Sequence, residues 1–144
     1  MLIRLAIIGF YCVLVAFAGH AETFEVKMLN KGKSGKMVFE PDFVLATVGD
    51  TVTFLPTDKG HNVESIKGMI PTNVKKFKSK FNKEFSINLE KEGLYGVKCT
   101  PHYTMGMIAL IQVGNALNFE KVISVRQRGK AKKRFDLLFE KIKN

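Results

Sequence analysis

Apolar and polar residues alternate along most of the chain, in short runs separated by turn-forming residues. Alternation with a period of two is typical of strands that bury one face. Alternating or short apolar runs bounded by turn signals predict strands at seven positions. These are 23–29, 37–40, 43–46, 51–55, 84–89, 94–98 and 108–113. Many short strands separated by turns indicate an all-β fold, a Greek-key β-sandwich or barrel.

The pattern changes near the C-terminus, where apolar residues follow helical spacing in two segments, 118–128 and 130–143, separated by Gly129. The apolar positions are Phe119, Val122, Ile123, Phe135, Leu138, Phe139 and Ile142. We interpret both segments as α-helices packed on the sandwich, with Lys and Arg facing water. A helix lying on a membrane surface is the alternative, which so short an apolar stripe does not favour.

The first 21 residues have the character of a secretory signal peptide, with one positive charge before an apolar run over 5–17. That run is too short to span a bilayer. Cleavage is expected after Ala21, with Ala18 as the alternative. The sequence therefore predicts a signal peptide over 1–21 and a single domain over 22–144, with no stable membrane insertion.

The chain is strongly basic, with 23 Lys and Arg against 13 Asp and Glu and a net charge of +10. Removal of residues 1–21 takes away Arg4 alone and leaves 22 basic and 13 acidic residues, a net charge of +9. Such a charge favours an acidic partner surface. No recognised nucleic-acid motif accompanies it, so we expect no nucleic-acid partner.

Candidate metal chemistry lies in the nine residues from Cys99 to Met107, Cys-Thr-Pro-His-Tyr-Thr-Met-Gly-Met. Cys99 is the one cysteine that remains after residue 21, so it cannot form an internal disulfide and is a free thiol or a ligand. His102 follows in the same loop, and His61 lies in a second loop. Two histidines, a cysteine and a weakly bound methionine are the ligand set of a blue-copper electron-transfer site. Chemistry alone leaves Met105 and Met107 as competing axial ligands.

Other metal functions fit this residue set less well. Catalytic metal sites keep one position open, whereas protein side chains occupy every position here, so we expect no enzymatic activity. Structural zinc is usually bound by Cys and His without Met. A copper carrier or storage protein is the main alternative function, but its ligands would be richer in Met or His and partly open.

Several segments resemble the pseudoazurins, which are periplasmic blue-copper proteins of the cupredoxin fold. These segments are Met28–Gly32, Met37–Pro41, Gly49–Phe54, Asp58–Lys67 and Lys98–Met107, in the same order as in the family. The resemblance runs from Glu22 to about Val113, and the two C-terminal helices are similar to the family's arrangement. It implies a cupredoxin-like sandwich with one type I copper ion that cycles between Cu(II) and Cu(I) in the periplasm.

The resemblance also implies roles for individual residues. His61, Cys99, His102 and Met107 would bind copper, and Met105 would be a loop-surface or packing residue. Asn62 would tie the two ligand loops together by hydrogen bonds. For Met37, a position near the exposed histidine ligand and an ordinary core position remain equally open.

The expected partner is an acidic redox protein, by resemblance a copper nitrite reductase of denitrification or a c-type cytochrome. The chain would be a monomeric one-electron carrier. An apolar patch around His102 would be ringed by lysines that favour brief electrostatic encounters. These lysines are Lys31, Lys59, Lys78 and Lys98.

Overall fold

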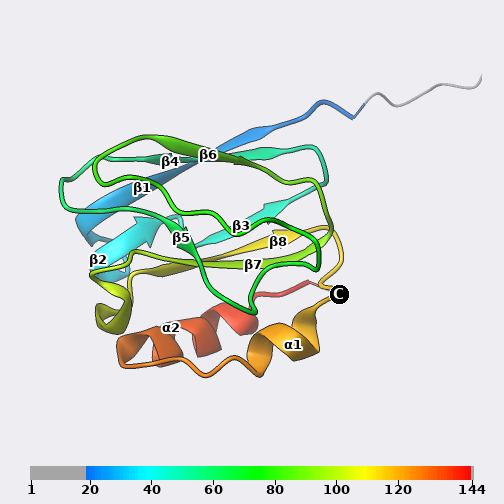
Figure 1. Cartoon of the computed structure of the whole chain (residues 1–144). Coiled ribbons are helices and arrows are strands. Elements are labelled where there is room, and N and C mark those ends of the chain that lie inside the picture. Colours follow the sequence, from blue (N-terminus) through cyan, green and yellow to red (C-terminus); the bar gives the residue numbers. More distant parts are fainter. Residues whose placement is uncertain (1–18, 144) are drawn as a thin grey trace, which may run out of the picture.

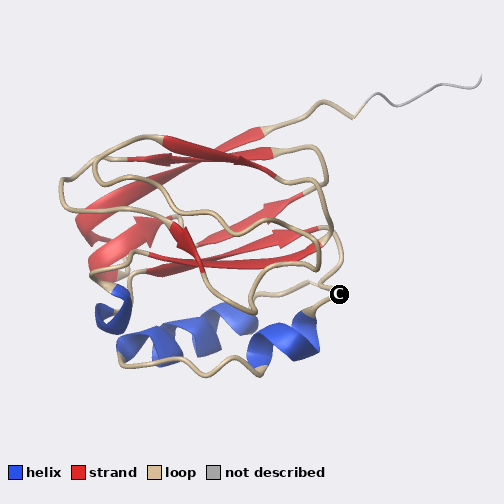
Figure 2. Cartoon of the chain, in the orientation of Figure 1, coloured by secondary structure: helices blue, strands red, loops and turns tan. Residues whose placement is uncertain are grey.

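A computed structural model describes residues 19–143 of the chain. Two four-stranded sheets stack face to face, and two short helices cover the outer face of one of them (Figures 1 and 2). The first sheet has the order β2-β1-β4-β6 and the second has the order β3-β8-β7-β5. The strands are β1 (Thr23–Gly32), β2 (Gly35–Glu40), β3 (Phe43–Ala46), β4 (Thr51–Leu55), β5 (Glu64–Ser65), β6 (Phe85–Asn88), β7 (Gly93–Lys98) and β8 (Ile108–Val113). The helices are α1 (Phe119–Ile123) and α2 (Lys130–Phe139).

The chain moves repeatedly between the two sheets, as in a Greek-key sandwich. β1 and β2 form an antiparallel hairpin, whereas β1 pairs with β4 in parallel and β3 pairs with β8 in parallel. Parallel pairs need crossover connections, and here those connections run over the ends of the sandwich. Loops from different parts of the chain therefore meet at each end, and the predicted all-β fold with two C-terminal helices is confirmed.

The core has two layers that explain the differing strand patterns. Between the sheets, Phe39 and Phe54 pack edge to face with ring centroids 5.5 Å apart. Beneath the second sheet, Phe135 and Leu138 of α2 are buried against its outer face. All six residues of β8 are buried, because the core covers one face and the helices cover the other.

The seven predicted strands are confirmed, and β5 was missed because two residues carry no periodic signal. Both helices are shorter than the sequence pattern predicts. α1 ends at Ile123, which is 40% exposed, and the chain then runs in an irregular segment held by the side chain of Gln127, which donates to the carbonyl of Val125. Burial of the apolar face of α2 contradicts the membrane-surface alternative.

The predicted signal peptide falls mostly on residues 1–18, which lie outside the described residues. Within the part of the chain that the structure describes, no helix has the length and apolar character needed to cross a membrane.

Asp50 closes the turn that leads into β4 and anchors the start of β1. Its carboxylate is 4% exposed and accepts hydrogen bonds from the backbone N–H of Glu22 at 2.8 Å and of Thr47 at 2.7 Å. The Thr47 hydroxyl donates a third hydrogen bond at 3.0 Å. The backbone bonds from Glu22 and Thr47 hold the pKa of Asp50 below its usual value, against the opposing effect of burial.

We predict that Asp50→Asn lowers the free energy of unfolding at neutral pH, because the amide cannot accept these three bonds as an ionised carboxylate does. A carboxyl group with a lowered folded-state pKa stabilises the protein above its ordinary pKa and loses that effect as pH falls through the lowered value. The difference between wild type and variant in urea unfolding should thus be full above about pH 4 and shrink below it. Asp136→Asn, at an exposed ion pair with Lys132, is the control, and an equal loss in both variants would contradict the assignment.

Candidate metal centre

The pairing of β5 with β7 brings the two predicted ligand loops together. In this antiparallel pair, Glu64 lies opposite Lys98 and Ser65 opposite Val97. The residues just before β5 therefore lie beside the residues just after β7. His61 belongs to the first group and Cys99 to the second, so the register places them side by side although 38 residues separate them. The loop between β7 and β8 then turns through a 3-10 helix, Tyr103–Met105.

Three donor atoms of the predicted ligands form a compact triangle. Cys99 Sγ lies 3.7 Å from His61 Nδ1 and 3.5 Å from His102 Nδ1, and the two Nδ1 atoms are 3.2 Å apart. The point equidistant from these three atoms lies about 2.0 Å from each, close to the bond lengths of about 2.0–2.3 Å that nitrogen and sulfur ligands make to zinc. The residues present therefore fit one transition-metal ion.

The ring of His61 is fixed from behind by Asn30. His61 is fully buried, and its Nε2 lies 2.8 Å from the side-chain oxygen of Asn30. An amide oxygen can only accept, so Nε2 carries the proton and the lone pair of Nδ1 faces Cys99 and His102. Burial lowers the pKa of His61, and the neighbouring His102 lowers it further. Both effects favour the neutral imidazole that a metal requires.

Asn62 ties the two ligand loops together, as the resemblance implied. Its side-chain oxygen accepts the backbone N–H of Thr100 at 2.8 Å, and its amide group donates to the Thr100 hydroxyl at 2.9 Å. That hydroxyl in turn donates to Glu64 at 2.7 Å. Burial raises the pKa of the Cys99 thiol, while hydrogen bonds from the backbone N–H groups of Asn62 and His102 partly offset this. The same two groups would stabilise a thiolate.

Burial separates the two candidate axial methionines. Met107 is fully buried in the core cluster that also contains Cys99, whereas Met105 is 42% exposed. The backbone of Met107 is hydrogen-bonded to the two other candidate ligands in its loop. Its carbonyl accepts the N–H of Cys99 at 2.9 Å, and its N–H donates to the carbonyl of His102 at 3.1 Å. Met105 therefore lies at the surface of the loop. Met37 is partly buried and packs against the same core cluster.

Two residues near the centre gave no signal in the sequence. Asn30 directly follows the first predicted strand and reads as a turn residue, and Arg134 reads as one more solvent-facing cation of a basic tail. Both act through contacts between distant parts of the chain. Arg134 donates to the carbonyl of Gly106, beside Met107, at 2.6 Å.

Comparison with known proteins agrees with this geometry. A profile described as copper binding proteins of the plastocyanin/azurin family matches residues 26–114. A pseudoazurin of Paracoccus pantotrophus is 52% identical over 123 residues, which cover 85% of each chain. The chain belongs to the pseudoazurin family. A second pseudoazurin, from Methylorubrum extorquens, is 45% identical over 99% of both chains.

Solved structures of the family lead to the same assignment. The crystal structure of native pseudoazurin from Hyphomicrobium denitrificans superposes with a TM-score of 0.81 at 46% identity, over 85% of this chain and 99% of that one. Members of this family are copper-binding cupredoxins that carry electrons and are not enzymes. The chain is therefore an electron carrier of this kind, and its cofactor is copper.

Proposed function

We propose that the chain is a periplasmic carrier of single electrons in which His61, Cys99, His102 and Met107 bind the copper ion. The triangle of donor atoms beside a fully buried Met107 is the observation that supports this ligand set. Bound there, copper supplies a reversible one-electron couple, and a weak axial ligand tunes its potential. Zinc would fit the triangle equally well by distance, but a thioether ligand favours copper.

The chain's own residues keep the donors in one arrangement. Asn30 orients His61, and Asn62 and Thr100 join the two ligand loops. Because these bonds are made by the chain's own residues and not by the ion, the donors need little reorganisation when the copper charge changes. His61, Cys99 and Met107 are fully buried, which opposes the alternative of a carrier that hands over its copper.

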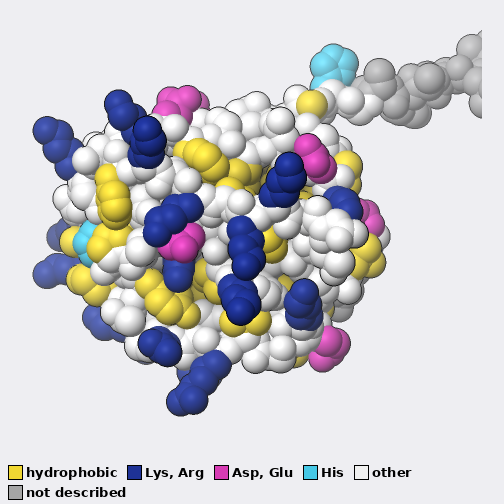
Figure 3. All heavy atoms as spheres, in the orientation of Figure 1, with side chains coloured by type: hydrophobic (Ala, Val, Ile, Leu, Met, Phe, Trp, Pro, Cys, Tyr) yellow, Lys and Arg dark blue, Asp and Glu magenta, His cyan; other side chains and the backbone are white. Residues whose placement is uncertain are grey.

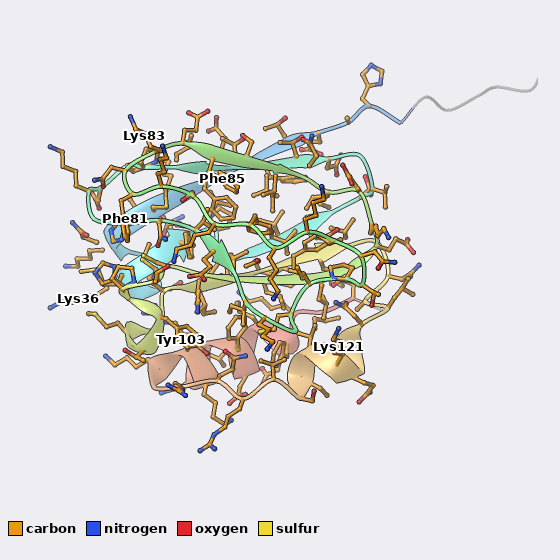
Figure 4. The ribbon with its side chains drawn as sticks, viewed as in Figure 1. Lys36, Phe81, Lys83, Phe85, Tyr103 and Lys121 are labelled. Carbon is orange, nitrogen blue, oxygen red and sulfur yellow. The ribbon has the colours of Figure 1, made fainter. Side chains whose placement is uncertain are left out.

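His102 is the one proposed ligand that is partly exposed, and it provides a short route for an electron to the surface. Pro101 and Met105 beside it are exposed. At the left edge of the molecule in Figure 3, a histidine side chain lies among hydrophobic side chains, with Lys and Arg side chains around them. Figure 4 places Lys36 and Phe81 at the same end. A small apolar patch with a basic rim suits brief contact with an acidic partner.

The lysines assigned to this rim fall into two groups, those that are exposed and those that lie close to an acidic residue. Lys31 and Lys59 are exposed next to residues that support His61. Lys78 and Lys98 lie 3.7 Å and 4.0 Å from the carboxylate of Glu64, and Lys98 also stacks over the ring of Tyr103. We therefore assign the steering of a copper nitrite reductase or a c-type cytochrome mainly to Lys31 and Lys59.

A periplasmic location requires removal of residues 1–21. Cleavage after Ala21 would turn the backbone nitrogen of Glu22 into an α-ammonium group, 2.8 Å from the Asp50 carboxylate. An ammonium binds a carboxylate more strongly than a neutral N–H does, so this cleavage point suits the fold.

We predict that Cys99→Ser abolishes the strong visible absorption of the copper-loaded protein, because that band arises from the thiolate. Met107→Leu should retain copper and shift its reduction potential, because the axial bond is weak. Met105→Leu, an exposed methionine two residues away, is the matched control. The axial assignment would be wrong if Met105→Leu altered the visible spectrum more than Met107→Leu.

We predict that the protein isolated from the periplasm begins at Glu22. Intact-mass measurement checks this directly, and a start at Gly19 would instead indicate cleavage after Ala18. Recovery of the chain with residues 1–21 still attached would contradict export by a cleaved signal peptide.

We predict that Lys59→Glu slows second-order electron transfer to a purified copper nitrite reductase by roughly a few-fold at low salt, with an unchanged copper spectrum. Steering of this kind raises association rates by about ten- to a thousandfold in total and is screened by salt. Stopped-flow rates at several ionic strengths measure the effect. Lys121→Glu makes the same charge change on α1, which Figure 4 places away from Lys36 and Phe81.

Lys132 and Lys133 are less suitable controls for docking alone, because the start of α2 packs against the 3-10 helix of the ligand loop and their charges are not remote from the proposed docking face. Equal rates for the Lys59 and Lys121 variants would mean that only overall charge matters, and the localised docking face would have to be abandoned.

A further inference from the structure

The guanidinium group of Arg134 joins the C-terminal helix to the ligand loop. Nη1 donates to the carbonyl oxygen of Gly106 at 2.6 Å and to that of Met37 at 3.0 Å. Nη2 donates to the carbonyls of Lys36 at 3.1 Å and Ser34 at 3.3 Å. One side chain of α2 thus holds two other segments: the loop that carries Met107, and the turn between β1 and β2 together with the start of β2. The start of α2 lies next to the 3-10 helix of the ligand loop, with β2 beyond it, in Figure 1.

The backbone around Arg134 leaves room for this side chain. A Cβ on Gly106 would lie 2.8 Å from Cδ of Arg134, and a Cβ on Gly35 would lie 3.2 Å from Nη2. Both glycines also have positive φ, +92° and +120°, which L-residues with side chains rarely adopt. The pocket for the guanidinium is therefore shaped by glycine on two separate segments.

Backbone carbonyls, rather than a paired carboxylate, bind this cation. Burial lowers the pKa of Arg134, and Asp42 acts in the opposite direction. The Asp42 carboxylate has its own ion pair with Lys141 at 3.5 Å. The planar fork of arginine can reach several acceptors in fixed directions. A half-buried guanidinium that donates to four carbonyls therefore fixes the relative positions of the segments that carry them.

The bond to Gly106 acts on the peptide group that enters Met107. The carbonyl of that peptide is held by Arg134, and its N–H donates to the carbonyl of His102 at 3.1 Å. The carbonyl of Met107 accepts the N–H of Cys99. The bonds to His102 and Cys99 lie inside the loop, so Arg134 supplies a restraint from a different layer of the fold.

We propose that Arg134 is a positioning residue for the copper centre. By fixing the Gly106–Met107 peptide, it sets how closely the Met107 thioether approaches the His61, Cys99 and His102 donors. Residues that orient metal ligands through such contacts change metal affinity when they are removed, typically by about 10–100-fold. The proposal rests on the ligand set given above, since it requires Met107 to be the axial ligand.

The experiment compares Arg134→Gln, Arg134→Lys and the control Lys133→Gln, which removes the same charge from an exposed position of the same helix. The readouts are the reduction potential, the visible spectrum, copper affinity by chelator competition, and the amide NMR signal of Met107 in the copper-free protein. In Arg134→Gln we expect a shifted potential, a moved Met107 amide signal and copper affinity weakened by about tenfold or more. Lys133→Gln should match the wild type in all four.

Arg134→Lys separates charge from geometry. Lysine keeps the positive charge but lacks the planar fork, so it should shift the potential and the Met107 signal in the same direction as Gln. If Lys restores the wild-type potential, charge alone acts and positioning is excluded. Arg134→Lys also keeps the proposal testable if Arg134→Gln fails to fold.

A lower melting temperature with unchanged potential, spectrum and Met107 signal would overturn the proposal and leave Arg134 a purely structural residue. Met107→Leu distinguishes this result from failure of the ligand set. If Met107→Leu shifts the potential and the Arg134 variants do not, only the positioning role is lost. If neither shifts it, the axial assignment itself is wrong.

Discussion

The structure depends on holding two imidazoles and a thiol within 4 Å of one another at a site where His61 and Cys99 are fully buried. Such groups do not stay together by their own attraction. Burial disfavours a charged His61 and an ionised Cys99, and each ring nitrogen and the sulfur would otherwise seek water. The fold must supply the constraint, and it does so with backbone and amide hydrogen bonds that point into the two ligand loops.

The sandwich supplies this constraint through strand register. A shift of one residue between β5 and β7 would turn every side chain of β5 to the other face and would move His61 away from Cys99. That register is protected because Val97 and Ser65 are buried, and because β8, on the other side of β7, is buried along its whole length. The helices make this possible by covering the outer face of the second sheet. The metal centre therefore depends on the helical layer even though no proposed ligand comes from it.

The periodic parts of the fold could be predicted from the sequence, because an alternating strand such as 23–29 carries its burial pattern in its own residues: Val26 and Met28 are buried and Lys27 between them is exposed. β5 could not, since two residues show no period and are fixed by pairing with β7 on one side and with Phe77 and Lys78 on the other. The first predicted helix extended past the end of α1 because Ile123 is apolar, which predicts a buried face, whereas its side chain is 40% exposed. In the centre, the local spacing singled out Cys99 and His102 as candidates, and His61 was added by its chemistry from a second loop that only the tertiary structure brings beside them. The sequence chemistry left Met105 and Met107 as competing axial candidates, the resemblance favoured Met107, and the full burial of Met107 agrees with that choice.

The supporting residues were out of reach for a different reason. Asn30 acts on His61 across 31 residues and Arg134 acts on Gly106 across 28 residues, and neither contact leaves a local pattern. The ligand loop is also restrained at both of its ends, and each restraint comes from a different layer of the fold. Asn62, next to the second sheet, binds Thr100 at the start of the loop, and Arg134, from the helices, binds Gly106 at its end.

Other contacts of the tail act on the same loop. The Tyr103 hydroxyl donates to Gln127 at 2.6 Å, and a Cβ on Gly129 would collide with the carbonyl of Thr104. The segment before α2 thus packs closely against the 3-10 helix of the ligand loop. The loop has backbone bonds of its own, such as those from Cys99 N–H to the Met107 carbonyl and from Gly106 N–H to the Tyr103 carbonyl. The contacts from the helical layer add restraints that these internal bonds do not supply. From the sequence, the C-terminal segment is recognisable only as basic. In the structure it packs against the outer side of the copper-binding loop and holds it in place.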